Sequence, residues 1–177
     1  FLREATPKEI KGRIIGIISP HAGYVYSGSV AAYGYKLLKN ISESIKTVVI
    51  IGFNHRIYHR GIAVCDFDSY KTPLGEVKID KELTDELISQ DGKIYPLREA
   101  FYNENSTEMQ VPFLQMVLKD FKLVIIHMGE QNLENCKILS QALYKVLRKR
   151  ENFILIGSTD MSHYLSYQEA NKVDSYT

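Results

Sequence analysis

Four short apolar runs, rich in β-branched residues, recur along the chain. They cover residues 14–18, 48–51, 123–126 and 153–156. None of them alternates apolar with polar positions as a half-exposed strand would, so each is predicted to be a strand that is buried on both faces. Strands of this kind are typical of a parallel sheet covered by helices on its two sides.

Helical patterns fill most of the intervals between these strands. The predicted helices cover residues 29–40, 81–90, 107–118 and 133–147. Asp80 and Asn132 are expected to cap two of them, and Pro112 marks a kink or a helix start. Residues 61–78 do not follow this alternation of strands and helices, and their short apolar run and turn residues predict a peripheral strand or hairpin. The alternation of strands and helices predicts a single α/β domain over residues 1–177, with a mainly parallel, doubly wound sheet flanked by helices.

Polar residues follow each predicted strand directly, and four of the five histidines are among them. His21 follows the first strand, His55 the second and His127 the third, and Asp160 and His163 follow the fourth. Ligands of open α/β sheets bind outside the carboxyl ends of the strands. The sequence therefore predicts a pocket at that edge of the sheet, built around His21 and His55.

Two neutral imidazoles on neighbouring strand ends could bind a transition metal such as iron, copper or zinc. Stable metal sites usually take three or four protein ligands, so the pair His21 and His55 is by itself an incomplete site. The alternative is that His21 is a loop histidine bonded to local backbone. We expect His59 to be an exposed loop residue and His127 to occupy a core or rim position.

Carboxylates near these histidines are candidates for chemistry. If a helix begins at Asp160, then Asp160 and His163 lie on one helical face. The carboxylate would complete a two-histidine, one-carboxylate metal site or orient His163 as an acid or base; alternatively it caps the following helix. Glu104 and Glu108 could act as acid–base groups or support metal ligands, and a solvated helix N-terminus explains them equally well.

Composition narrows the classes of partner. The 22 basic and 21 acidic residues give a net charge of +1, which offers no reason to expect nucleic acid or an anionic membrane as a partner. No apolar run approaches the roughly 18 residues that cross a bilayer, and the start does not resemble a signal peptide. We expect a cytoplasmic protein in which Cys65 and Cys136 are buried free thiols. Motifs for dinucleotides, nucleoside triphosphates and α/β-hydrolase chemistry are absent.

Several motifs together resemble the Memo family (the AmmeMemoRadiSam system protein B group), in the family's order and over nearly the whole chain. They are residues 19–28 (SPHAGYVYSG), 52–55 (GFNH), Tyr70 with 72–75 (TPLG), 104–114, and 158–164 (STDMSHY). The resemblance implies a fold similar to class III extradiol dioxygenases, which are non-haem iron enzymes. It also implies that His21 and His55 stand at two metal-binding positions and that Asp160 and His163 line the same pocket.

The chain departs from the family's pattern at three points. Asn105 stands where the family often has a histidine, which removes one pocket imidazole. Neither Cys65 nor Cys136 matches the family's further ligand, a cysteine near its C-terminus. Family members continue beyond the position of Thr177, so we expect a fragment that lacks the family's C-terminal third, with a metal site that is incomplete or metal-free.

The predicted function is that of a Memo-like protein with an iron- or copper-binding pocket and a redox or dioxygenase-like role. His21 and His55 are the candidate metal ligands, and Asp160, His163 and Glu108 are the candidate catalytic residues. Two alternatives stay open: a hydrolase that uses Asp160 and His163, and a non-catalytic module that binds a peptide or a small molecule. The sequence specifies neither a substrate nor an oligomeric state.

Overall fold

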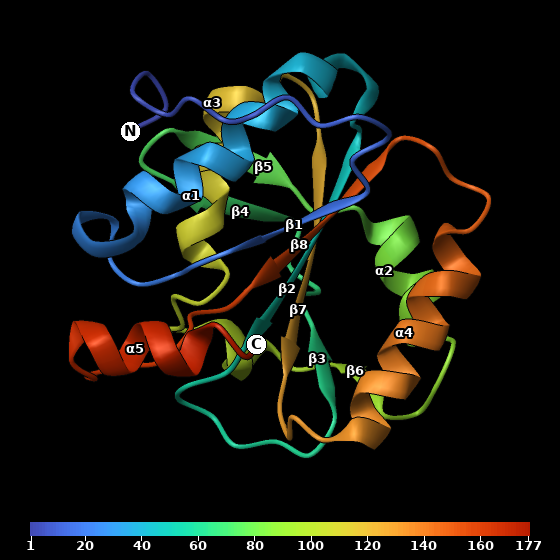
Figure 1. The fold of residues 1–177 in the computed structure, drawn as a ribbon. Coiled ribbons are helices and arrows are strands. Elements are labelled where there is room, and N and C mark those ends of the chain that lie inside the picture. Colours follow the sequence, from blue (N-terminus) through green and yellow to red (C-terminus); the bar gives the residue numbers. More distant parts are fainter.

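A six-stranded mixed sheet forms the centre of the computed structural model, which describes all 177 residues (Figure 1). The strand order is β1-β8-β2-β7-β3-β6. Strands β1, β8, β2 and β7 are mutually parallel, whereas β3 runs antiparallel to β7 and pairs with β6 in parallel. The strands are β1 (Gly16–Ser19), β2 (Thr47–Phe53), β3 (Ile62–Val64), β6 (Ile94–Pro96), β7 (Lys122–Met128) and β8 (Phe153–Ser158).

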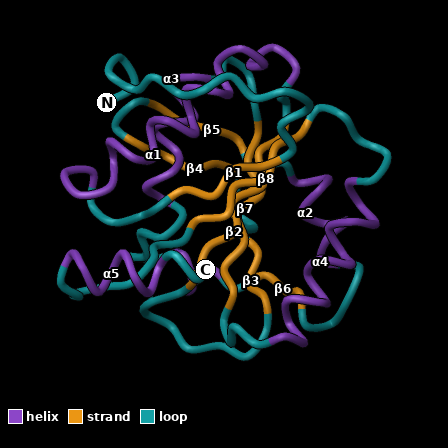
Figure 2. Tube along the Cα trace, in the orientation of Figure 1, coloured by secondary structure: helices purple, strands orange, loops and turns teal.

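Helices lie on both sides of this sheet, as Figure 2 shows. The α-helices are α1 (Tyr24–Leu38), α2 (Lys81–Ile88), α3 (Val111–Val117), α4 (Leu133–Leu147) and α5 (Tyr167–Asp174), and the 3₁₀ helices are η1 (Lys39–Ser44), η2 (Arg98–Phe101) and η3 (Glu108–Gln110). Helices α1 and α3 contribute to one apolar core, and α2 and α4 contribute to a second core on the other face. The predicted α/β architecture with a mainly parallel sheet is confirmed.

Local signals in the sequence located several element boundaries. Asp80 accepts a hydrogen bond from the Leu83 amide at the start of α2, and Asn132 does the same for Asn135 at the start of α4. Pro112 stands in the first turn of α3, where its missing N–H costs nothing. Residues 61–78 supply β3 and a separate hairpin of β4 (Ser69–Thr72) and β5 (Gly75–Lys78).

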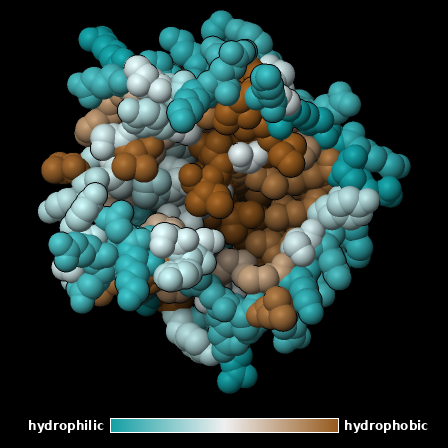
Figure 3. All heavy atoms as spheres, viewed as in Figure 1, coloured by the Kyte–Doolittle hydropathy of each residue, from teal (hydrophilic) through white to brown (hydrophobic).

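The prediction that all four apolar strands are buried on both faces holds only in part for β8, where Phe153 and Leu155 are half-buried, and is wrong for β1. This strand lies at the edge of the sheet, and Ile18 is 80% exposed, while Ile15 just before it is 59% exposed. Part of the sheet face beside β1 is not covered by a helix, and Figure 3 shows an apolar, hollowed area over the middle of the molecule. An apolar run indicates a strand but not what covers it.

Two further expectations about single residues are wrong, and the alternative reading of Asp160 as a helix cap is excluded. His59 is buried, at 7% exposure, rather than exposed. Cys136 is exposed, because α4 turns Asn135 inward to donate hydrogen bonds to the carbonyls of Arg60 and Glu130. Asp160 does not cap a helix that follows it, since the next helix, α5, begins at Tyr167 and is capped by Ser166. Cys65 is a buried free thiol, as expected.

None of the helices combines the length and the apolar character that a membrane-spanning helix needs.

Candidate functional site

The ends of β1 and β8 bring two polar segments side by side at the carboxyl edge of the sheet. Ser19 and Ser158, the last residues of these strands, are register partners. Beyond them, Asp160 Oδ1 accepts hydrogen bonds from the backbone amides of His21 (2.6 Å) and Ala22 (3.0 Å). The carboxylate therefore fixes the turn that carries His21 just before α1 begins.

A second carboxylate fixes the segment that carries His55, at the end of β2. Glu104 Oε2 accepts from the His55 amide at 2.5 Å, and Oε1 accepts from the His55 ring Nδ1 at 2.8 Å and from the Ser106 amide at 2.8 Å. An ionised carboxylate only accepts hydrogen bonds, so His55 Nδ1 is the donor in this contact, and a neutral His55 ring carries its single hydrogen there. The other nitrogen, Nε2, is left with a free lone pair.

Four of the five residues that the sequence singled out lie together. The rings of His21 and His55 meet edge to face, with centroids 5.4 Å apart. Asp160 Oδ2 lies 3.7 Å from His21 Nε2 and 3.5 Å from His163 Nε2. Asp160 thus stands between a buried histidine and one whose side chain is 57% exposed. Glu108 is exposed in η3 and takes no part in the hydrogen bonds or ion pairs of this group.

Burial and hydrogen bonding set the protonation of the site. Burial lowers the pKa of His21, against the opposing effect of the Asp160 charge, so this ring is neutral at pH 7. Burial by itself would raise the pKa of Glu104, but the hydrogen bonds from His55 and Ser106 outweigh it and lower this pKa. At pH 7, His21 is therefore a neutral imidazole and Glu104 an ionised carboxylate.

The other two histidines have different surroundings. His127 is buried, with Nδ1 bonded to the Ala100 carbonyl at 3.0 Å and Nε2 to the Thr107 hydroxyl at 2.8 Å. Both ring nitrogens therefore have hydrogen-bond partners, and burial lowers the pKa of His127 to about 4. These are the features of a neutral histidine in the core. Neither ring nitrogen of the buried His59 has a hydrogen-bond partner. His59 lines, with His55, a cavity of about 250 Å³ under the loop that follows β2.

Three residues that the sequence did not select shape this site. Glu104 was weighed only as one of a glutamate pair, and Ser158 and Gln110 were not assigned any role. Ser158 could have been noticed as the last residue of the strand next to the one that carries His21. Gln110 offered no signal, because a buried glutamine in an amphipathic segment cannot be told from a surface one by spacing alone.

The donor set for a metal ion is partial. No group of three or more His, Cys, Asp or Glu side chains is arranged so that it could hold a metal ion. The pair His21 and His55 still offers two imidazoles, whose Nδ1 atoms are both hydrogen-bonded to protein groups while their Nε2 atoms are not. This is how proteins orient histidine ligands, so the two residues fit a transition metal as part of its ligand set.

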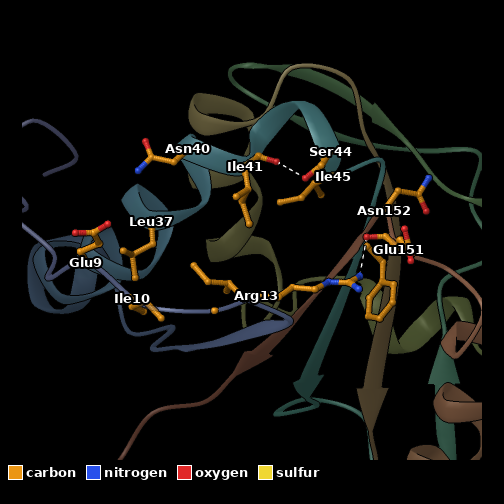
Figure 4. Close-up of a pocket in the computed structure, with 13 residues that line it drawn as sticks. Glu9, Ile10, Arg13, Leu37, Asn40, Ile41, Ser44, Ile45, Glu151 and Asn152 are labelled. Carbon is orange, nitrogen blue, oxygen red and sulfur yellow. Dashed lines mark hydrogen bonds between the residues drawn. The ribbon is translucent and has the colours of Figure 1, made fainter.

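A cavity of about 560 Å³ lies at the opposite edge of the sheet (Figure 4). It is enclosed by the chain before β1, the end of α1 with η1, and the start of β8. Arg13 crosses it and donates a hydrogen bond to the Glu151 carbonyl at 2.8 Å. None of the histidines lines this cavity, so it is separate from the site built around His21 and His55.

Comparison with known proteins finds similarity to a single family. A sequence model described as Memo-like protein matches residues 1–177. A MEMO1 family protein of Methanococcus maripaludis is 40% identical over 187 residues, which cover 99% of this chain and 65% of the relative. Relatives with the same description from Methanopyrus kandleri (37% identical, 90% of this chain, 56% of the relative) and Archaeoglobus fulgidus (38%, 99% and 65%) are similar. The chain spans less than two thirds of the length of these relatives.

Proposed function

The chain belongs to the Memo-like protein family, and from this premise and the geometry of its histidines we propose that it binds an iron or copper ion through His21 and His55. The observation that carries the proposal is the contact of the two rings, 5.4 Å apart, each held at Nδ1 by a protein group. Imidazole nitrogen suits both metals.

The surrounding residues support this assignment. Glu104 orients His55 and Ser158 orients His21, while Asp160 adds a negative charge close to His21 Nε2. Imidazole nitrogen and carboxylate oxygen are the ligand types of non-haem iron sites. His21, His55 and Asp160 supply these types but are not arranged as a complete three-ligand set. A metal bound there would supply a redox-active Lewis acid. His163 is exposed and lies 3.5 Å from Asp160, and in this proposal it holds or releases a proton beside the site.

Metal content tests the proposal directly. The purified chain is loaded with Fe(II) under anaerobic conditions or with Cu(II), dialysed, and analysed by inductively coupled plasma mass spectrometry. We expect the wild type to retain metal and the double variant His21→Ala/His55→Ala to retain only background. His59→Ala is the matched control, since it removes a neighbouring histidine outside the pair and should leave binding intact. Equal retention by the wild type and the double variant would overturn the proposal.

The proximity of Asp160 and His163 supports a second candidate, which we propose as hydrolysis with His163 as the general base. The 3.5 Å separation and the exposure of His163 would allow it to activate water for an ester, amide or phosphate substrate. A panel of such substrates compared between wild type and His163→Ala decides this. Activity that is present and unchanged in the variant removes His163 from that role.

A further inference from the structure

We propose that Ser158 is a positioning residue that holds the His21 ring in the tautomer with its hydrogen on Nδ1 and its lone pair on Nε2. Ser158 is the last residue of β8 and is almost completely buried. Its Oγ forms hydrogen bonds with three groups: the Ser106 carbonyl, Gln110 Nε2 at 2.7 Å and His21 Nδ1 at 3.1 Å. One hydroxyl has one hydrogen and two lone pairs, so three partners occupy it completely.

The orientation of the Gln110 amide follows from its neighbours. The group that lies 3.0 Å from the Pro20 carbonyl must be the NH₂ of Gln110, because a carbonyl only accepts hydrogen bonds. The same NH₂ then donates its second hydrogen to Ser158 Oγ, and Gln110 Oε1 accepts from the Tyr35 hydroxyl at 2.6 Å. Gln110 is fully buried and fully bonded, so it has no freedom to flip.

The hydrogen of Ser158 is assigned by the same reasoning. The Ser106 carbonyl contacts Ser158 Oγ and can only accept, so it takes the single hydroxyl hydrogen. Gln110 donates to one lone pair of Ser158, which leaves the second lone pair for His21. His21 Nδ1 must therefore be the donor in its contact with Ser158, and the neutral ring carries its lone pair on Nε2.

This assignment places two acceptors opposite each other. His21 Nε2, with a lone pair, faces Asp160 Oδ2 at 3.7 Å, beyond hydrogen-bonding distance. A cation or a ligand donor would satisfy both atoms. Without Ser158 the ring hydrogen would move to Nε2, because a carboxylate is a stronger acceptor than the groups left near Nδ1. That hydrogen would occupy the nitrogen proposed to bind metal; this consequence rests on the proposed function, whereas the tautomer does not.

The tautomer is read by NMR on metal-free protein. Long-range ¹H–¹⁵N correlation spectra of ¹⁵N-histidine-labelled chain distinguish protonated from unprotonated ring nitrogens, and the His21 signals are those lost in His21→Ala. We expect Nδ1–H in the wild type and a change toward Nε2–H in Ser158→Ala. Ser19→Ala is the matched control: it deletes a buried hydroxyl without a partner at the register-paired position of β1, and should leave the His21 tautomer unchanged.

Metal affinity gives a second measurement. Loss of an outer partner of a ligating histidine typically weakens metal binding about 10- to 100-fold, so we expect that loss in Ser158→Ala and partial recovery in Ser158→Thr. A wild-type His21 with its hydrogen on Nε2, or a folded Ser158→Ala with the wild-type tautomer, would overturn the inference. The wild-type spectrum decides even if Ser158→Ala does not fold. If no metal binds but the tautomer is as expected, the proposed function fails and the role of Ser158 stands.

Discussion

At the scale of single residues, Glu104 carries a charge in almost complete burial, and its environment makes this tolerable. Its side chain has no exposed surface, yet three N–H donors from His55 and Ser106 point at its two oxygens. Donors that converge on a buried carboxylate keep it ionised and fix the groups that donate. Glu104 therefore stabilises the fold and holds His55 in place at the same time.

Replacement of Glu104 by Gln should be destabilising at pH 7. The amide presents an NH₂ where the carboxylate accepted, so at least one donor of His55 or Ser106 loses its partner. We expect a loss of about 1–3 kcal/mol in the free energy of unfolding, measured by urea denaturation. Glu108→Gln, four residues away and exposed, should stay within about 0.5 kcal/mol of the wild type. A similar cost for both variants would contradict this account.

The same residue predicts a pH dependence. The pKa of Glu104 is lower in the folded chain than its ordinary value of 4.5, so the folded state binds this proton less readily than the unfolded state. The stabilisation by the carboxylate is therefore complete above pH 4.5 and is lost as the pH falls through the folded pKa. The stability difference between wild type and Glu104→Gln should shrink over that range.

The sequence predicted part of this site and could not predict the rest. His21, His55, Asp160 and His163 were found because they follow strands, and the ends of parallel strands meet at one edge. The choice between Glu104 and Glu108 depends on where the chain turns into η3, which spacing does not specify. The burial of His59 depends on Gly129, where an added Cβ would lie 1.9 Å from the His59 carbonyl oxygen.

At the scale of elements, Asp80 joins a helix to the sheet. Its side chain accepts from the Leu83 amide in the first turn of α2 at 3.3 Å and from the Thr47 hydroxyl at the start of β2 at 2.8 Å. Its backbone amide also donates to the Leu123 carbonyl in β7. One residue thus caps α2 and sets the position of the helix against two neighbouring strands.

Removal of the Asp80 side chain should test both contacts together. Asp80→Ala leaves the Leu83 amide and the buried Thr47 hydroxyl unpaired, and we expect a loss of about 1–3 kcal/mol in unfolding free energy. Asp80→Asn keeps an oxygen for the cap and should recover most of this loss. If thermal denaturation gave the same midpoint for Asp80→Ala and the wild type, the cap would contribute nothing.

Helix caps were predictable from sequence because they are local, whereas the start of α1 and the exposure of β1 were not. α1 begins at Tyr24, five residues before the predicted start. The sequence did not predict these first turns because they carry the exposed apolar residues Val25, Tyr26 and Val30 instead of an amphipathic pattern. β1 carries the same kind of apolar run as β2. Only its place at the edge of the sheet makes it different, and that place follows from pairing with β8, which is distant in sequence.

At the scale of the whole molecule, the two faces of the sheet are covered unequally. One core packs beneath α2 and α4, and the other beneath α1 and α3. Beside β1 the cover ends on the face of α2 and α4, where Ile18 is 80% exposed, while Ile50 of β2 is fully buried on the opposite face. Two isoleucines in parallel strands of one sheet therefore contribute very differently to the stability of the chain.

Equal truncations at these two positions measure that difference. Ile50→Ala should cost about 2–5 kcal/mol of unfolding free energy, because it removes transfer energy and leaves a cavity in a closed core. Ile18→Ala should stay within about 0.5 kcal/mol, since its side chain is already in water. Both are measured by urea denaturation at a low protein concentration. A cost at Ile18 that approaches the cost at Ile50 would mean that this face is covered in solution, and would contradict the exposure of β1.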